Sequence, residues 1–361
     1  MSPTTATETR AAALENDNTV LADFNYWGAT SLPDLSDFYE ILNGSSQRLR
    51  SVRCKVYDIR ACGLPAFSLS THAFQILQHS SSLLPPQSAS IPDFHDQTLM
   101  KSTYWPELTS LLKSQLGVRS AVAINTSVRD VSQIGKGEFN PNNPRANPKQ
   151  SLAPFFFVHG DYTPGGARAH MRAVLPTFFE DNGCVESTAA WERGEFFKLR
   201  DEIVQAEEEG MKLEGVTDQW LWSGKNYAGP RWAILSVWRP LDSVHRDPLA
   251  IMDPRTLFKQ GVERKPYAPF ERTYKDRPGF VKEYTSANML PITPETGDEH
   301  RWYYISNQKP EELYALKLFD SEAHKQGSDV AECSAHSAFS LPEQENEEPR
   351  RSAEVRVMVI W

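Results

Sequence analysis

The sequence predicts a β-rich α+β protein, a sandwich or barrel of strands with helices packed on its outside, formed as one domain. Segments that alternate like strands concentrate in the second half of the 361 residues, and segments with helical spacing lie in the first and middle parts. The 25 prolines and the 11% aromatic content suit a β-rich fold with many ordered loops. A chain of this length can bury a large core.

Helices and strands are mixed in the first 150 residues. Pro106 and Glu107 suit the first turn of a helix, and Gly117 suits its end. The Asn-, Pro- and Gly-rich stretch 135–154 predicts an exposed loop. In order along the chain, we expect a helix at 34–42, a strand at 52–59, helices at 71–84 and 104–116, and a strand at 118–126.

Strands dominate the remainder of the chain. Residues 254–300 carry many Pro and Lys and little periodicity, so we expect a loop there. Pro176 is expected to interrupt a helix. In order, we expect helices at 168–180 and 194–209 and strands at 232–238, 302–306, 312–319 and 352–361; residues 249–253 are a short apolar stretch.

The bulk properties exclude several classes of partner. The net charge of −9 argues against nucleic acid or an anionic membrane surface, and no apolar run approaches the roughly 20 residues that cross a bilayer. Residues 1–18 lack the features of a secretory signal and are expected to form a flexible tail. The four cysteines have no CxxC spacing, as expected for reduced thiols. We therefore expect a cytoplasmic protein that acts on a small molecule; its oligomeric state stays open, a homodimer included.

A candidate metal site begins in residues 155–163, where an apolar run ends in a His-x-Asp triplet. In a strand, His159 and Asp161 would point the same way, about 6–7 Å apart. One imidazole and one carboxylate can share a metal ion, and a second histidine would complete the facial triad of non-haem iron(II) oxygenases. The triplet alone is a weak signal because His245 and Asp247 repeat it. That second triplet lies in a segment without strand alternation.

The second histidine is expected late in the chain. His336 lies among small and apolar residues, ahead of a basic pair and a terminal strand, and is preferred. His324 lies in a polar connection, and His170 is interpreted as a surface or packing residue on a helix. The full set of candidates is His170, His245, His300, His324 and His336.

The terminal strand suits the binding of 2-oxoglutarate. This keto acid can chelate iron while its far carboxylate requires a fixed cation, for which arginine offers a planar fork. Arg350 and Ser352 could serve the same carboxylate, with Arg356 as second choice; a solvated polar face is the competing interpretation. One face of the strand carries Arg350, Ser352, Glu354 and Arg356.

Other residues are candidates for the pocket. Arg239, at the end of a buried strand, could hold the cosubstrate or an anionic substrate group, and a structural ion pair is the alternative. Tyr162 and Arg168 flank the metal segment and are candidate substrate contacts. Phe339 is a further candidate, although an aromatic residue in this position is more often part of the core.

An ordered series of stretches over roughly residues 50–361 resembles a mainly fungal family of secondary-metabolism enzymes. The family includes hydroxylase/desaturases of the aspergillic-acid type, gibberellin-desaturase-like proteins and relatives of the small subunit of cephamycin 7-methoxylation. The stretches are Val56-Tyr57-Asp58-Ile59-Arg60, Tyr104-Trp105-Pro106-Glu107, His159-Gly160-Asp161-Tyr162-Thr163, Trp238-Arg239-Pro240-Leu241, His336-Ser337-Ala338-Phe339 and Arg350 to Arg356.

The resemblance implies a double-stranded β-helix (jelly-roll or cupin-like) core with flanking helices, and chemistry with Fe(II), 2-oxoglutarate and O₂, with ascorbate as a supporting reductant. It matches His159, Asp161 and His336 to the metal ligands and places Thr163 in the His-x-Asp-x-Thr pattern. The arginines of the terminal strand are matched by Arg350 and Arg356. The expected organisation is one oxygenase domain over 19–361, with a mixed part to about 150 and the jelly roll over about 151–361.

The implied activity is oxidation of an aliphatic C–H bond of a small molecule by hydroxylation, desaturation or oxidative cyclisation. An amino acid or a compound derived from one is the favoured substrate. Two alternatives stay open. One is a non-catalytic protein with the same fold that binds a small molecule or a catalytic partner, and the other is a cupin-like metal enzyme that uses no 2-oxoglutarate.

Overall fold

The computed structural model describes residues 19–361 with gaps at 29–30, 33, 35–39, 41–45, 64–65, 85–93, 134–152, 259–265 and 342–343. The expected tail at 1–18 lies outside the described residues. Most of the expected helix at 34–42 and nearly all of the expected loop at 135–154 also lie outside them.

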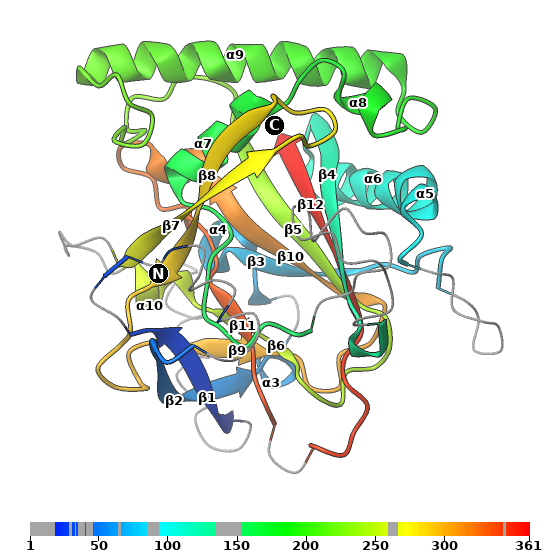
Figure 1. Cartoon of the computed structure of the whole chain (residues 1–361), viewed down its shortest axis with the longest axis vertical. Coiled ribbons are helices and arrows are strands. Elements are labelled where there is room, and N and C mark those ends of the chain that lie inside the picture. Colours follow the sequence, from blue (N-terminus) through cyan, green and yellow to red (C-terminus); the bar gives the residue numbers. More distant parts are fainter. Residues whose placement is uncertain are drawn as a thin grey trace, which may run out of the picture.

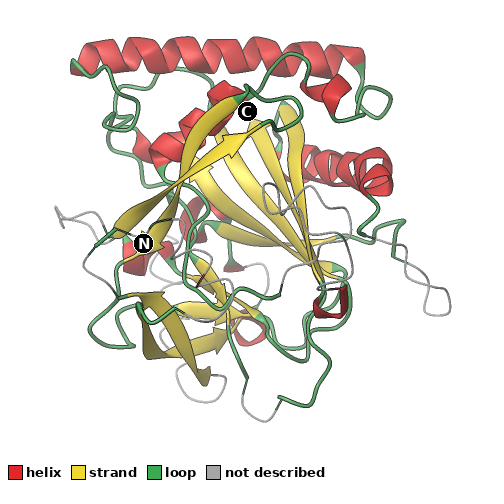
Figure 2. Ribbon diagram, in the orientation of Figure 1, coloured by secondary structure: helices red, strands yellow, loops and turns green. Residues whose placement is uncertain are grey.

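Most of the strands belong to two five-stranded sheets. The first has the order β1 (Thr19–Trp27), β2 (Leu49–Asp58), β9 (Trp302–Tyr304), β6 (Leu249–Met252) and β11 (His336–Ala338). The second has the order β3 (Phe74–Gln78), β10 (Glu312–Asp320), β5 (Trp232–Pro240), β12 (Ser352–Ile360) and β4 (Ser120–Arg129). Each sheet therefore combines strands from both ends of the chain. In Figures 1 and 2 the sheet with β1 and β2 lies at the bottom of the view and the sheet with β5 and β12 lies in the middle.

The second sheet is covered on both faces. Every residue of β5 and β10 is buried, as expected for central strands that are packed on both sides. Its apolar side chains share one core with Ile251 and Tyr303 of the first sheet and with Leu112 and Phe196 of the covering helices. The prediction of a strand sandwich with outer helices is confirmed.

The main covering helices are α6 (Trp105–Leu116), α7 (Pro164–Ala173) and α9 (Ala190–Glu214), with α9 running across the top of the view in Figure 1. Helix α6 ends at Gly117, whose φ of 64° is a left-handed conformation that favours glycine. The shorter helices are α3 (Ile59–Cys62), α4 (Leu69–His72), α5 (Gln97–Leu99), η2 (Met100–Tyr104), η3 (Val131–Gln133), α8 (Phe178–Asp181), α10 (Pro254–Leu257) and η4 (Ser321–His324). None of the helices in the described part of the chain combines the length and hydrophobicity that a membrane crossing requires.

The predicted helix at 71–84 is wrong. Helix α4 ends at His72, the next residue Ala73 has a φ of 56°, and the chain continues as β3. Phe74 pairs with Leu316 of β10, so an aromatic and β-branched segment with some helical spacing is held extended by its neighbour strand. The predicted helix at 168–180 is divided: α7 ends at Ala173 and α8 begins at Phe178.

The predicted loop at 254–300 is also wrong. Strands β7 (Tyr267–Lys275) and β8 (Glu283–Pro291) form an antiparallel two-stranded sheet. Pro269 and Pro291 obscured this pair in the sequence, but a two-stranded sheet consists of edge strands, where proline is tolerated. The expected strand at 155–163 is irregular and forms isolated bridges with His336 and Met289.

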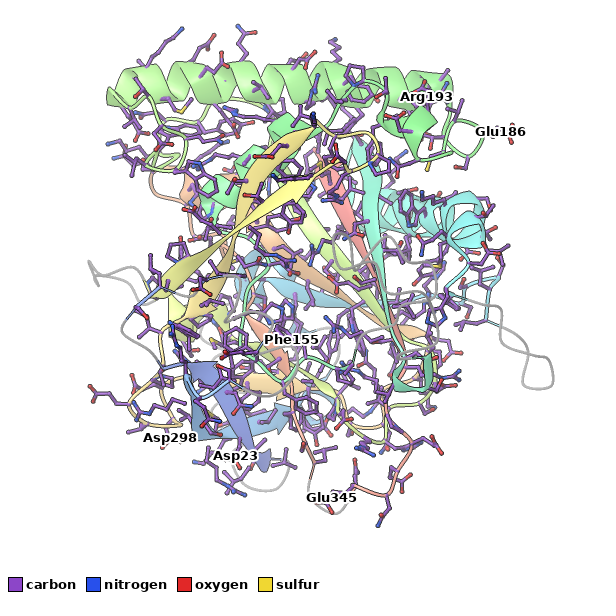
Figure 3. The ribbon with its side chains drawn as sticks, viewed as in Figure 1. Asp23, Phe155, Glu186, Arg193, Asp298 and Glu345 are labelled. Atoms are coloured by element: carbon purple, nitrogen blue, oxygen red, sulfur yellow. The ribbon has the colours of Figure 1, made fainter. Side chains whose placement is uncertain are left out.

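Charged side chains gather at the rim of the view in Figure 3, where Glu186 and Glu345 point outward, whereas Phe155 lies toward the middle. Phe155 leads into the His-x-Asp segment, which is bridged to β11 at His336 and to β8 at Met289.

Candidate metal centre

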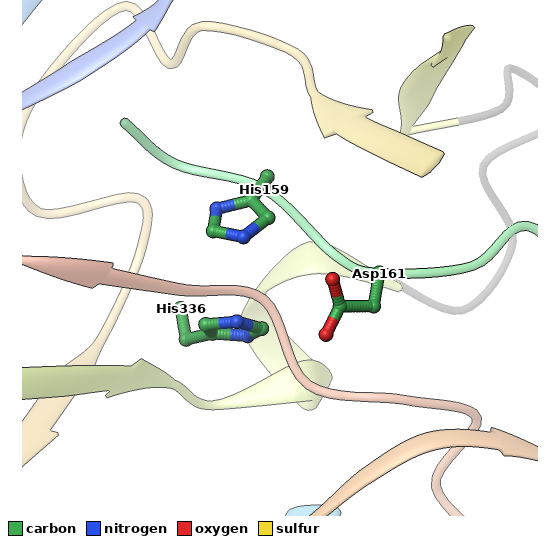
Figure 4. A group of neighbouring side chains, drawn as sticks. All are labelled: His159, Asp161 and His336. Atoms are coloured by element: carbon green, nitrogen blue, oxygen red, sulfur yellow. The ribbon is translucent and has the colours of Figure 1, made fainter. Parts of the chain in front are cut away.

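Two imidazoles and one carboxylate converge at one point inside the protein (Figure 4). His159, Asp161 and His336 each offer one ligand atom, and these atoms all lie within 4.8 Å of one another. Among the described residues, this is the one group of three or more His, Cys, Asp or Glu side chains close enough to share a metal ion. The structure thus brings together the three residues expected from the sequence.

A short backbone bridge places the two histidines side by side. The His159 N–H donates to the His336 carbonyl over 3.2 Å, and the His336 N–H donates back over 2.9 Å. Their ring centroids are 4.5 Å apart. His336 is itself held in the first sheet because β11 pairs with β6, where His336 lies opposite Ile251. The late histidine therefore reaches the triplet through strand pairing.

Gly160, between the two ligands of the triplet, lies against the hairpin. Its N–H donates to the Met289 carbonyl over 2.7 Å, and the Met289 N–H donates back over 2.8 Å. A Cβ atom at position 160 would overlap the methyl group of the Met289 side chain. Glycine therefore permits the close approach that fixes His159 and Asp161 against β8.

Both imidazoles are held in the tautomer that a metal requires. Nδ1 of His159 donates to the Phe157 carbonyl over 2.8 Å, and Nδ1 of His336 donates to the Ser334 carbonyl over 3.3 Å. Because a carbonyl only accepts, each Nδ1 carries a proton, which makes Nε2 the lone-pair atom of the neutral ring. Burial, aided by the nearby His336, lowers the pKa of His159 to about 3, so its ring stays neutral near pH 7.

The carboxylate of Asp161 is held from the terminal strand. Nη2 of Arg356 donates to Oδ1 of Asp161 over 2.7 Å, and the Asn288 side chain donates to the Asp161 carbonyl over 2.8 Å. Burial opposes the charge of Arg356, but Asp161, Tyr162 and Glu354 together outweigh it and raise the pKa of the guanidinium. Arg356 therefore binds the carboxylate of Asp161, whereas the sequence indicated it as the second choice for binding the cosubstrate.

A cavity that is partly open to solvent lies beside the two histidines. Apolar walls come from Trp238, Leu249 and Leu316. Two arginines, one glutamate and two serines also line it; these are Arg129, Arg350, Glu354, Ser236 and Ser337. The cavity thus joins the candidate ligands to a basic and partly apolar space.

Arg350 is buried at this cavity, and one of its N–H groups is not hydrogen-bonded among the described residues. Its Nη1 donates to the Asp247 carbonyl over 2.6 Å, and its guanidinium lies 5.1 Å from the centre of the Trp238 ring. Its Nε and the hydroxyl of Ser352 are buried and have no hydrogen-bond partner among the described residues. Burial, together with the charge of Arg129, lowers the pKa of Arg350 to about 9, so it remains a cation near pH 7.

Two other expected site residues have structural partners instead. Arg239 is fully buried and donates to the Tyr104 hydroxyl over 2.7 Å and to the carbonyls of His79 and Pro310. Thr163 caps α7, where its hydroxyl accepts from the Gly166 N–H over 3.1 Å. These hydrogen bonds occupy both polar groups, and neither residue lines the cavity.

The expected substrate contacts also lie elsewhere. Arg168 donates to the Trp222 carbonyl over 3.0 Å and stacks on that indole at 4.5 Å. The Tyr162 hydroxyl is 3.2 Å from Nδ1 of His170. Phe339 packs in the core against Tyr304. The Arg356 guanidinium, which pairs with Asp161, lies 5.6 Å from the Tyr162 ring. The rival triplet is not assembled: His245 is exposed and bonds to Asn307.

Arg129 is the cavity residue that the sequence did not reveal. It is the last residue of β4, and it lies directly opposite Ser352 of β12. Residues opposite each other in an antiparallel pair share a face, so Arg129 faces the same side as Arg350 and Ser352. The position of Arg129 beside Ser352 follows from the pairing register of β4 with β12, and the residue spacing within either segment alone does not show it.

The chain matches the model of the family described as "Oxidoreductase/YMDC permease-like domain" over residues 37–188 and 216–360. Among curated proteins, the "Gibberellin cluster GA4 desaturase" of Gibberella fujikuroi is 28% identical over 85% of this chain and 86% of that protein. The "Alpha-ketoglutarate-dependent dioxygenase phiK" of a fungal species is 25% identical over 92% of this chain and 91% of that protein. The "Hydroxylase/desaturase asaB" of Aspergillus flavus is 34% identical over 36% of this chain and 56% of that protein.

A solved structure titled "iron and alpha-ketoglutarate-dependent endoperoxidase NvfI with different conformation" has a TM-score of 0.56 to this chain. It is 19% identical and covers 96% of this chain and 99% of that one, which establishes the likeness of fold.

The fold and the cluster of His159, Asp161 and His336 together define a jelly-roll protein of the oxidoreductase class, as predicted. The chain belongs to the family whose model it matches. The predicted resemblance to fungal hydroxylase/desaturases is confirmed by the relatives.

Proposed function

We propose that this protein is a non-haem Fe(II), 2-oxoglutarate-dependent dioxygenase that oxidises an aliphatic C–H bond of a small molecule in secondary metabolism. The observation that carries the proposal is the cluster of His159, Asp161 and His336 beside a cavity with a buried arginine. The names of the relatives support it, since they are α-ketoglutarate-dependent dioxygenases, hydroxylase/desaturases and a desaturase.

The donor set fits Fe(II). Two neutral imidazoles and one carboxylate are the ligands of the facial-triad oxygenases, which leave further coordination positions open. His159, Asp161 and His336 would hold the ion, and the protons on both Nδ1 atoms are already directed to carbonyl groups. When bound, Fe(II) with 2-oxoglutarate and O₂ supplies an oxidant able to break an unactivated C–H bond.

The chain binds and orients the cosubstrate through its terminal strand. Arg350 would pair with the far carboxylate of 2-oxoglutarate, and Ser352 would add a hydroxyl donor. This assignment is supported by the unused Nε of Arg350 and the unused hydroxyl of Ser352. A buried guanidinium gains strongly from a carboxylate partner because water does not compete with the pair.

The cavity walls decide which bond reacts. Trp238, Leu249 and Leu316 present apolar surface next to the ligands, so they exclude water and pack on the hydrocarbon part of a substrate. Hydroxylation, desaturation and cyclisation share the same hydrogen removal and differ in the step after it. The outcome of that later step depends on how the walls hold the substrate.

We further propose that the enzyme works in the cytoplasm on a freely diffusing small molecule. The support is that all four cysteines are free thiols, as expected for a reducing compartment.

Conversion of 2-oxoglutarate to succinate without added substrate tests the proposed function. Protein prepared without metal and then loaded with Fe(II) is expected to form succinate in air and to stop when a chelator removes the metal. Iron binding without succinate would instead support the non-catalytic alternative. Succinate formation also separates the proposal from a cupin-like metal enzyme that uses no 2-oxoglutarate.

A further inference from the structure

Arg129 gives the cavity a second cation that the cosubstrate does not need. It lies on β4 opposite Ser352, and it lines the same cavity as Arg350. Its Nη1 donates to the Ala153 carbonyl over 2.7 Å, and its guanidinium lies 6.0 Å from the centre of the Phe155 ring. Within the described part of the chain, no carboxylate forms an ion pair with Arg129 or Arg350.

The two arginines differ in their exposure. The side chain of Arg350 is buried, with the residue 4% exposed, whereas Arg129 is only partly buried. A carboxylate that enters deeply meets Arg350, and a carboxylate that stays nearer to solvent meets Arg129. The cavity therefore presents two cations that differ in their exposure to solvent.

A charge count shows that one positive charge is left over. Arg129, Arg350 and Arg356 surround the cluster and its cavity, against the carboxylates of Asp161 and Glu354. Fe(II) adds two positive charges, and 2-oxoglutarate removes two. The loaded site thus keeps one positive charge, which would be unbalanced in a space with apolar walls.

Glu354 acts on the charge of Arg129 at a distance, but its hydrogen bond and its ion pair are made with other residues. Its Oε1 accepts from the Ser236 hydroxyl over 3.0 Å and lies 3.5 Å from Nε of Arg356. Glu354 is therefore directed along β12 and β5 toward Arg356, and the guanidinium of Arg129 remains available at the cavity.

We propose that Arg129 determines substrate specificity by binding a carboxylate of the substrate, so that the enzyme acts on small apolar molecules that carry one carboxylate. This inference rests on the proposed function and deepens it. Arg350 holds the cosubstrate, Arg129 holds the acid group, and the hydrocarbon part of the substrate lies on the apolar walls between Arg129 and the metal ligands. The planar fork of arginine suits this two-point contact with a carboxylate.

Matched acid and amide probes test this assignment by binding rather than turnover. Co(II)-loaded protein is saturated with 2-oxoglutarate without oxygen and titrated calorimetrically with cyclohexanecarboxylate, 3-phenylpropanoate and decanoate, and with the primary amide of each. Acid and amide have the same shape, so their ratio of dissociation constants isolates the charge. For the acid that binds best, we expect a dissociation constant about tenfold or more below that of its amide.

Three variants test whether Arg129 causes the preference for the acid over the amide. Arg129→Gln is expected to abolish it, and Arg129→Lys to retain part of it because the charge remains. Arg351→Gln is the matched control, since this neighbouring arginine pairs with Asp242 away from the cavity. The affinity for 2-oxoglutarate should fall further in Arg350→Gln than in Arg129→Gln.

Several results would overturn the assignment. These are equal binding of acids and amides, no binding by any acid, survival of the preference in Arg129→Gln, or a larger loss of 2-oxoglutarate affinity in Arg129→Gln than in Arg350→Gln. Failure of the proposed function looks different: the wild-type protein would then not bind 2-oxoglutarate at all, and the acid preference could still be measured on protein loaded with metal alone.

Discussion

Arg356 and Asp161 form a largely buried ion pair in which Nη2 of the arginine lies 2.7 Å from Oδ1 of the aspartate. One oxygen of the candidate ligand is thereby held by the terminal strand. Asp161 also contributes one of the three ligand atoms that lie within 4.8 Å of one another, so β12 acts on the metal site through this pair as well as on the cavity through Arg350.

Removal of the Arg356 charge should weaken metal binding. In Arg356→Gln the Asp161 carboxylate loses the partner that fixes its orientation, and partners of this kind are typically worth about 10–100-fold in metal affinity. Anaerobic titration with Fe(II) or Co(II) measures the change, with Arg351→Gln as control. An unchanged dissociation constant for the metal would show that the ion pair does not position the ligand.

Substitutions of two adjacent arginines should have very different effects on the affinity for 2-oxoglutarate. Arg350 is buried at the cavity, whereas Arg351 pairs with Asp242 near the surface. Loss of a charge-assisted contact of about 1.5–3 kcal/mol should raise the dissociation constant for 2-oxoglutarate about 10–150-fold in Arg350→Gln, with little change in Arg351→Gln. Equal effects in the two variants would remove Arg350 from its assigned role.

Substitution of Thr163 should lower the stability of the fold and leave the affinity for 2-oxoglutarate unchanged. Its hydroxyl caps α7 by accepting from the Gly166 N–H, so Thr163→Ala should lower the free energy of unfolding by about 1 kcal/mol. Thr163→Ser keeps the hydroxyl and should keep most of the stability. Chemical denaturation checks both variants. A weaker affinity of Thr163→Ala for 2-oxoglutarate at unchanged stability would return Thr163 to the cofactor-binding residues.

His324 should make the metal-free protein less stable in acid. Burial, with help from Arg168, lowers the pKa of its ring to about 3, against about 6.5 in an unfolded chain. Between these values the unfolded chain binds a proton that the folded protein does not, so the free energy of unfolding falls as the pH falls. From pH 7 to pH 5 this contribution is about 1–2 kcal/mol.

Denaturation of His324→Gln at both pH values measures that contribution. The variant should lose less stability than the wild type between pH 7 and pH 5, and His245→Gln, which changes an exposed histidine, should behave like the wild type. Parallel pH profiles for the wild type and His324→Gln would contradict the assigned cause.

The sequence predicted those features that depend on local pattern. Helix α6, with Pro106 near its start and Gly117 at its end, and the buried strand β5 follow from residue types and spacing. The triad was found from a triplet, a late histidine and an ordered resemblance. The hairpin β7–β8 and the role of Arg129 were missed, because both depend on which strands pair and in what register, and Pro269 argued against a strand.

Arg239 and Arg356 show the same limit for single residues. Both were candidates for the cosubstrate because a cation at a strand end suits a carboxylate. Their actual partners, Tyr104 for Arg239 and Asp161 for Arg356, come from elements distant in sequence. The type of side chain was predictable, and its partner was set by tertiary packing.

Release of succinate from 2-oxoglutarate by Fe(II)-loaded His336→Ala tests the central claim most directly. His336 supplies one of three ligands within 4.8 Å of one another, so its loss should reduce succinate formation to the level of metal-free protein, while His245→Ala should match the wild type. If His336→Ala formed succinate at the wild-type rate, the cluster of His159, Asp161 and His336 would not be the catalytic metal site.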